Sequence, residues 1–274
     1  MALARPVCTF FEAYWQDKFS NNLLPLRVGN DVATIEDVMG VIGIFCDRRR
    51  YLSRYTEYTK SNPLVVLLGK GEHQITSSWT SLYSDARQTT LSITRSNITF
   101  VGKGKDTTTI LGGFRIDNLE NITFKNMTVT NTSEEGCGIR VRNAKVELKD
   151  VALKECGNSA LSIDDVTSET TFVATRCNFA NSRYGAVACG SLTSATFNNC
   201  MIHDNRNHGI FGYESTIHIH GKASAIHSNR GSGISATCFA NVVIHLPSNH
   251  NTTYNNRGED RRTRIGGTFT NVED

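Results

Sequence analysis

Two histidines recur in nearly identical surroundings, which is the pattern expected of a repeated site. His203 lies in "MIHDNRNHGIFG", and His227 lies 24 residues later in "AIHSNRGSGISA". His220 and His245, in "IHIH" and "VVIH", form a second candidate pair. Imidazoles that lie one above the other can bind a metal ion or carry protons. Neither pair shares its position with a carboxylate or a cysteine, so we predict no metal site and no cofactor.

Four arginines repeat with a similar spacing. Arg206, Arg230 and Arg257 each directly follow an asparagine, and Arg183 lies one place later in its own repeat. If successive repeats stack, these like charges come within ~5–10 Å of each other, which costs energy unless the side chains splay apart or bind an anion. We therefore predict that the four arginines, together with the first pair of histidines, bind a uronate, a sulfated glycan or a phosphate backbone.

The alternative is a solvated face whose charge is balanced locally. Acidic residues near the arginines in the sequence could supply this balance: Asp204, Glu214, Glu259 and Asp260. Two basic runs, "DRRRYLSR" at 47–54 and "EDRRTR" at 259–264, could instead extend the positive surface. The formal net charge of +3 is small for 274 residues, so nucleic acid is the less favoured anion.

Asp164 and Asp165, in "SIDDV", are the best candidates for acid–base chemistry. Glycoside hydrolases use two carboxylates, one as general acid and the other as base or nucleophile. Adjacent residues on a strand point to opposite faces, so only one of the two can line a given groove. If the protein is an enzyme, we expect Asp164 or Asp165 to act with His203. The other interpretation is an acidic turn after a strand, because the further residues of the hydrolase signature are absent around this pair. The sequence also lacks the stacked Asp residues of a calcium-dependent lyase and the Gly-x-Ser-x-Gly motif of a serine nucleophile.

The elements that position these residues repeat with a period in the low twenties. Each repeat opens with a small residue, at separations of 22, 25, 24 and 24: Gly138, Ala160, Gly185, Gly209 and Gly233. Short apolar-alternating segments such as "KVELKDV" and "SATFNNC" accompany them. A self-similar period of this length indicates a solenoid. The chain lacks the leucine-rich pattern, so we predict an all-β fold, a right-handed parallel β-helix of about eight coils between residues 64 and 260.

Asparagines mark the turns of the predicted coils. Asn181, Asn205 and Asn229 each precede the small opening residue by four places, and Asn255 or Asn256 continues the series. Asn tolerates left-handed backbone, and its amide can hydrogen-bond to the coils above and below. We therefore predict that these residues form a structural ladder.

Residues 1–62 follow a different pattern. "TFFEAYWQDKF", at 9–19, places aromatic residues at helical spacing, and "TIED", at 34–37, fits a capping box at the start of a second helix. We predict an N-terminal α-helical cap over residues 1–62, which covers the open first coil, and a β-helix over residues 63–274.

Several features of the sequence bear on the cellular location of the protein. The longest apolar run, residues 38–46, is far shorter than the ~20 residues that span a bilayer, so we predict no membrane span. The eight cysteines lack CxxC spacing, and we expect them to be mostly reduced and buried. The N-terminal segment lacks the features of an export signal. These patterns favour an intracellular protein, with a virion as the alternative.

Several stretches resemble the right-handed β-helix domain of the pectin-lyase-like superfamily: "VVLLGKGEHQI", "NITFVGKG", "TTTILGGFRI" and repeats of the form "DNRNHGIFG". The resemblance covers about residues 64–245 and is closest to uncharacterised members from unicellular algae or their viruses. It implies the fold and favours acidic polysaccharides as ligands, since the superfamily includes lyases, glycoside hydrolases, epimerases and receptor-binding spikes.

Three functions are consistent with these patterns. We predict a non-catalytic scaffold or binding protein that presents its arginines to an acidic polysaccharide. The first alternative is a polysaccharide-active enzyme, either a lyase or a glycoside hydrolase. The second alternative is a virion or surface component that forms homo-oligomers along its rods.

Overall fold

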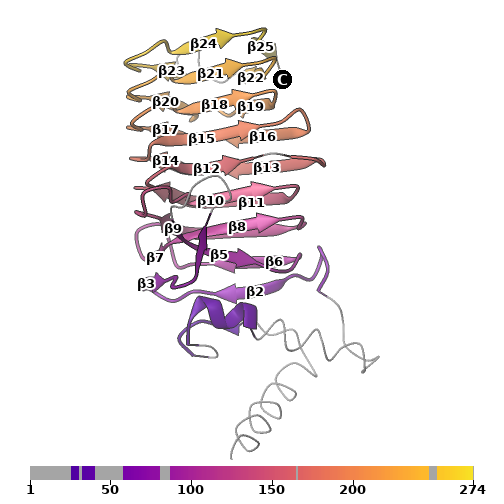
Figure 1. Cartoon of the computed structure of the whole chain (residues 1–274), viewed down its shortest axis with the longest axis vertical. Coiled ribbons are helices and arrows are strands. Elements are labelled where there is room, and N and C mark those ends of the chain that lie inside the picture. Colours follow the sequence, from indigo (N-terminus) through magenta and orange to yellow (C-terminus); the bar gives the residue numbers. More distant parts are fainter. Residues whose placement is uncertain are drawn as a thin grey trace, which may run out of the picture.

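The chain winds into a parallel β-solenoid (Figure 1). The computed structural model describes residues 26–30, 33–40, 58–80, 87–164, 166–246 and 252–273. Coils stack along the long axis of the molecule, and the strands of one coil pair in parallel with the equivalent strands of the next. Within the described residues, no helix is long and apolar enough to cross a membrane.

Each coil presents up to three strand-bearing faces. The first face is a nine-stranded sheet: β4 (Ser78–Thr80), β5 (Arg87–Ile93), β8 (Gly113–Asp117), β10 (Ile139–Arg142), β12 (Ser159–Ile163), β15 (Tyr184–Cys189), β18 (Ile210–Tyr213), β21 (Ile234–Thr237) and β24 (Arg261–Arg264). The second face is the main path of a sixteen-stranded sheet: β1 (Leu26–Arg27), β2 (Leu64–Leu67), β6 (Ile98–Val101), β9 (Ile122–Thr130), β11 (Lys145–Lys154), β13 (Thr170–Thr175), β16 (Thr193–Asn198), β19 (Thr216–His220), β22 (Asn241–Leu246) and β25 (Thr268–Glu273). The third face holds the remaining strands of that sheet: β3 (Gly71–Gln74), β7 (Thr108–Leu111), β14 (Asn178–Ala180), β17 (Met201–His203), β20 (Ala225–His227) and β23 (Thr253–Tyr254).

The solenoid has about seven turns in the described residues, rather than the eight coils that the repeats predicted. At the N-terminal end of the first face, β4 pairs antiparallel with β5. From β5 to β24 the strands of the first face pair in parallel, and each added coil repeats the same register.

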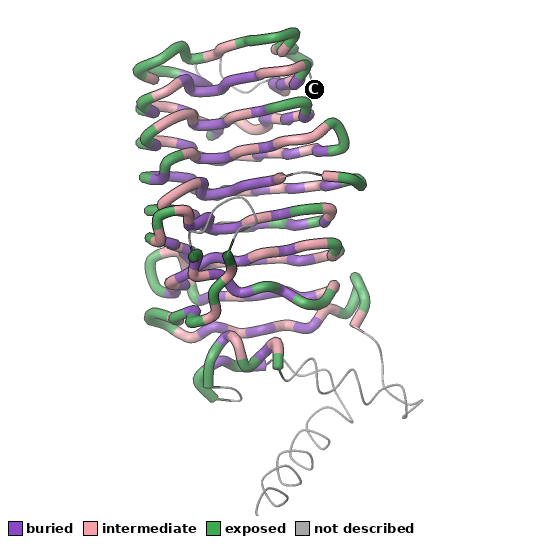
Figure 2. The backbone as a smooth tube through the Cα atoms, viewed as in Figure 1, coloured by how far each residue is buried: buried purple, intermediate pink, exposed green. Residues whose placement is uncertain are grey.

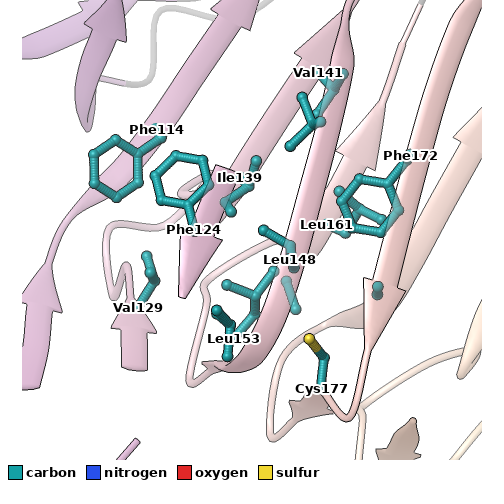
Figure 3. Packing of buried hydrophobic residues seen from close by; sticks show 14 of the residues in the cluster. Phe114, Phe124, Val129, Ile139, Val141, Leu148, Leu153, Leu161, Phe172 and Cys177 are labelled. Atoms are coloured by element: carbon teal, nitrogen blue, oxygen red, sulfur yellow. The ribbon is translucent and has the colours of Figure 1, made fainter. Parts of the chain in front are cut away.

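Alternation along each strand separates an apolar interior from a polar exterior. In β13, Phe172 and Ala174 are buried, and Val173 between them is half-exposed. Aromatic rings stack from coil to coil in the interior: the centroids of Phe100 and Phe124 lie 5.1 Å apart, with planes 10° from parallel. Figure 3 shows part of this core, and Figure 2 shows that exposed residues gather at the corners of the coils. The outward side chains are therefore free to vary, while the inward ones must fill the core.

The corners are made by residues in the left-handed backbone region. Asn126, Asp150, Arg176 and Asn199 occupy the same corner on four successive coils, with φ between 52° and 56°. Asn and Asp adopt this conformation most readily among residues with a side chain. Arg176 is held there by Asp150, to which its guanidinium donates two hydrogen bonds of 2.6 and 2.8 Å. These bonds hold the pKa of Asp150 below its ordinary value.

A short helix packs against the first coil. Residues 35–40 are helical, and the predicted capping box is formed: Thr34 N–H donates to Asp37 Oδ2 at 2.8 Å, and Asp37 N–H donates to Thr34 Oγ1 at 3.2 Å. Ile35 and Val38 are fully buried and belong to the solenoid core. The first predicted helix, at 9–19, lies outside the described residues. The helical cap over residues 1–62 is therefore not confirmed and stays a prediction.

Candidate functional site

The turn between β17 and β18 recurs on neighbouring coils and aligns the predicted arginines. Arg206 N–H donates to the Ser182 carbonyl at 2.8 Å, and Arg230 N–H donates to the Asn205 carbonyl at 2.9 Å. Each acceptor directly precedes the arginine of the preceding coil, so these arginines occupy equivalent positions. We call the four residues at this position the arginine row: Arg183, Arg206, Arg230 and Arg257.

A ladder of polar side chains accompanies the arginine row and is buried for most of its length. Its members directly precede the arginines: Ser182, Asn205, Asn229 and Asn256. Asn205 Nδ2 donates to Asn229 Oδ1 at 2.9 Å, and Asn205 Oδ1 accepts the Ser182 N–H at 3.1 Å. Asn205 and Asn229 are 0% and 1% exposed. At the last coil, Asp260 Oδ1 accepts from Asn256 Nδ2 at 2.8 Å and takes the place of a further ladder residue. The structural ladder predicted for Asn205, Asn229 and Asn256 is thus confirmed.

Asn181 does not belong to the ladder, which corrects the series predicted from the sequence. It occupies the preceding, left-handed position with Asp204 and Ser228, all three at a φ of 55°. Ser182 takes the ladder position because its coil has one fewer residue between the ladder and Gly185. Counting back from the glycine therefore shifts the assignment by one residue.

The four side chains of the arginine row are exposed, and no described carboxylate forms an ion pair with them. Arg206 Nη2 donates to the carbonyl of Gly157 at 3.1 Å, two coils away. Arg183 Cζ lies 5.8 Å from the ring centroid of Tyr184. Among the described residues, Arg230 and Arg257 find no partner for their guanidinium groups. The row therefore carries positive charge that no carboxylate in the described part of the chain neutralises through an ion pair.

The acidic residues that could have balanced the row lie elsewhere or have other partners. Asp204 Oδ2 lies 2.6 Å from His203 Nδ1. Glu259 Oε1 lies 3.7 Å from Arg262 Nε. Asp260 accepts a hydrogen bond from Asn256, the last residue of the ladder. Glu214 follows β18, at the opposite end of that strand from the row. Local compensation, the alternative interpretation of the arginines, finds no support in these contacts.

His203 and His227 stack on adjacent coils, as the repeat predicted. Their ring centroids lie 5.1 Å apart with planes 7° from parallel, and Tyr254 continues the stack 5.0 Å beyond His227. We call these three residues the histidine column. Within the column, His203 Nδ1 faces Asp204, and His227 Nδ1 lies 3.0 Å from Ser228 Oγ. Burial, with the neighbouring His203, holds the pKa of His227 below its ordinary value.

Asp164 and His203 lie at different corners of the solenoid. Asp164 Oδ1 accepts from Ser162 Oγ at 2.6 Å, and Asp164 Oδ2 lies 3.3 Å from Arg140 Nε. Asp164 comes directly after β12 and so lies at the C-terminal end of a first-face strand. His203 ends β17 and lies before β18, on the side of its N-terminal end. A strand of about five residues at roughly 3.3 Å each therefore separates the two corners. Asp165 lies outside the described residues.

His218 is a candidate that repeat counting did not identify. It faces outward on β19, two residues before His220, and its Nδ1 lies 3.1 Å from Nε2 of His245 on β22. Burial, with the neighbouring His245, holds the pKa of His218 below its ordinary value. The signal in the sequence is the pattern His-x-His within a strand, because residues i and i+2 share a face.

These observations define a class of protein: a parallel β-solenoid with a row of exposed cations along one edge. Residues 112–267 match the family described as "right handed beta helix region", and the chain belongs to this family. The predicted right-handed β-helix is thereby confirmed. No curated protein sequence matches the chain significantly.

Solved structures with similar architecture come from several sources. A protein of Geobacillus virus E2 shares 11% identity over 79% of this chain, with a TM-score of 0.47, and the chain spans 55% of that protein. A pectin methylesterase in complex with a hexasaccharide shares 13% identity over 91% of this chain and 93% of its own, with a TM-score of 0.47. The A-module of the Azotobacter vinelandii mannuronan C-5 epimerase AlgE4 shares 14% identity over 68% of this chain and 70% of its own, with a TM-score of 0.34. The finer resemblance to algal proteins or their viruses stays a prediction.

Proposed function

We propose that the protein binds an acidic polysaccharide along the arginine row, as a scaffold or binding protein without catalytic activity. The observation that carries the proposal is the stacking of four exposed arginines on successive coils, without a carboxylate partner among the described residues. Coils stack about 4.8 Å apart. The four arginines therefore extend from adjacent coils as like charges, and a bound polyanion relieves their repulsion.

A linear polymer with one carboxylate on each sugar suits a straight row. Each coil offers one guanidinium, and a guanidinium binds a carboxylate through two parallel hydrogen bonds. The phosphates of duplex DNA wind around the helix axis. A straight row of arginines can therefore contact a shorter stretch of DNA than of a linear polysaccharide. The geometry thus supports an acidic polysaccharide ahead of nucleic acid. The resemblance of the sequence to pectin-lyase-like proteins agrees with this choice.

Aromatic rings border the arginine row on both sides. The histidine column lies on the side of the third face. On the side of the first face, the centroid of His208 lies 6.2 Å from that of Tyr184 and 5.9 Å from that of Phe211. Binding sites for organic ligands commonly combine such flat apolar surfaces with a few oriented polar groups. Sugar rings have one apolar face, so these rings can support the chain between its carboxylates.

The test compares binding to immobilised polygalacturonate, alginate and duplex DNA at increasing salt. Charge reversal at two positions, Arg206→Glu with Arg230→Glu, should weaken binding to the uronate polymers on the order of tenfold at low salt. The salt dependence should also become flatter, because fewer counterions are displaced.

The matched control is Arg95→Glu with Arg142→Glu. Both arginines are exposed and lie outside the row, and the change in net charge is the same. This variant should keep most of the binding. Equal binding by the wild-type protein and the variant of the row would reject the proposal. Release of unsaturated products or new reducing ends from the same polymers would instead favour the enzyme alternative.

A further inference from the structure

Three histidines converge on the second face, away from the arginine row. His218 and His220 lie on β19, and His245 lies on β22 of the next coil. Ile219 pairs with Ile244, so His220 and His245 lie side by side. Their ring centroids are 3.7 Å apart, with planes 17° from parallel.

The nitrogen atoms of these rings approach each other as metal ligands do. His218 Nδ1 and His245 Nε2 are 3.1 Å apart, and one ligand nitrogen from each of the three residues lies within 4.8 Å of the others. Metal–nitrogen bonds of about 2.0–2.1 Å in a tetrahedral site separate two ligand nitrogens by about 3.3 Å. The first pair is close to that spacing. Coordination by the third nitrogen, which lies within 4.8 Å of the others, would require the stacked rings of His220 and His245 to rotate.

The fold does not demand histidine at these positions. On the coil before, the residues paired with His218 and His220 are Thr196 and Asn198. On the coil after, the residue paired with His245 is Val272. Small polar or β-branched side chains thus fill the same outward positions elsewhere in the solenoid. Three imidazoles confined to two adjacent coils are an addition to what the fold requires.

We propose that His218, His220 and His245 bind a transition-metal ion of the Zn²⁺ class. Three imidazoles form the protein ligand set of open zinc sites, in which water or an exogenous ligand takes the fourth position. All three side chains are partly exposed, so an ion can enter from solvent. Coordination through His218 Nδ1 places the proton of that ring on Nε2. This proposal differs from the prediction, made from the sequence, of no metal site, and it does not depend on the polysaccharide proposal.

The experiment titrates full-length, tag-free protein with Zn²⁺ and, in parallel, with Co²⁺. Calorimetry should report one equivalent of Zn²⁺ bound, and Co²⁺ should give the intense visible absorption of a tetrahedral site. The variant His245→Ala should lose at least tenfold in Zn²⁺ affinity together with the Co²⁺ signal. The variant His218→Ala should behave in the same way.

The matched control is His203→Ala with His227→Ala, which removes two stacked histidines elsewhere on these coils and leaves the three proposed ligands. It should bind Zn²⁺ as the wild-type protein does. Circular dichroism in EDTA should be the same for all variants, which separates loss of ligands from loss of fold. Failure of the wild-type protein to bind Zn²⁺, or binding that His245→Ala retains and the control loses, would overturn the proposal.

Discussion

The histidine column and the three converging histidines lie on neighbouring coils, yet their surroundings differ. In the column, the rings stack 5.1 Å apart and each Nδ1 faces the next residue of its own turn. In the cluster on the second face, a ring nitrogen of His218 faces one of His245 from the next coil. Both regions contain stacked imidazoles. What distinguishes the proposed metal site is that ring nitrogens from different coils approach each other.

The two regions also differ in how strongly the fold constrains them. The turn that follows the histidine column contains the buried ladder and a glycine in close contact with the next coil. The positions of the cluster face outward from a flat strand pair. We therefore expect changes in the turn to affect folding, and changes in the cluster to affect ligand binding alone. Four measurements test this contrast.

The largest effect should come from Gly209→Val in the turn. A Cβ at this position would lie 2.6 Å from the carbonyl oxygen of Gly233 and 2.8 Å from both Asn229 Nδ2 and Ile226 Cγ2. Since the crowding atoms include backbone and a buried amide, we expect destabilisation by about 3 kcal/mol or more, with low soluble yield. Urea unfolding followed by circular dichroism measures it. Gly69→Val is the control, because nothing lies within 4 Å of a Cβ there.

A smaller loss should follow Asn205→Leu in the ladder. The substitution keeps the number and branching of the side-chain heavy atoms. It leaves the buried Ser182 N–H without its acceptor and removes one of the two donors to Asn229 Oδ1, which keeps the Asn205 N–H. An unsatisfied buried polar group costs about 1–3 kcal/mol and each further lost hydrogen bond about 1 kcal/mol, so we expect about 2–4 kcal/mol in the free energy of unfolding. The same change at half-exposed Asn207 should cost far less. Equal losses at the two positions would show that the ladder does not stabilise the turn.

The cluster should respond in the opposite way. In EDTA, His218→Ala should change the free energy of unfolding by no more than about 0.5 kcal/mol, because the side chain is outward and partly exposed. With Zn²⁺ present, the wild-type protein should become more stable than the variant by mass action. Thermal unfolding with and without the ion measures both values. A large loss in EDTA would assign the cluster a structural role and remove the contrast with the turn.

The smallest effect should be a dependence on pH at His208. Burial and the positive charge of Arg262 lower the pKa of His208, whose Nδ1 accepts the N–H of Ser232 at 2.9 Å. The neutral form is favoured in the folded state, so its contribution is complete above the unfolded value of about 6.5 and is lost as the pH falls through the lowered pKa. The urea midpoint should decrease slightly from pH 8 to pH 5. His208→Gln should reduce that decrease, and an unchanged profile would count against this account.

Much of the architecture could be predicted from the sequence. A period of 22–25 residues with alternating apolar positions is one coil of a solenoid, because the strands of each coil pair with those of the next. The same reasoning predicted the stacked His203 and His227, and it aligned Arg206, Arg230 and Arg257 correctly. It placed Arg183 one residue later, whereas the structure puts Arg183 at the same position as the other three. It failed at Asn181, where one turn is a residue shorter, and at the first coil, where β4 turns back on β5. A change in turn length shifts the apparent register without changing the strand pairing.

The sequence by itself determined that successive repeats stack, and hence which residues share a position on neighbouring coils. Only the tertiary structure decided where each side chain is directed. It paired Asp204 with His203 and left the arginine row without a carboxylate partner among the described residues. It also brought His245 beside His218 and His220. The physical reason is that repeat spacing specifies backbone register, whereas ion pairing and metal coordination depend on distances of a few ångströms between side-chain atoms.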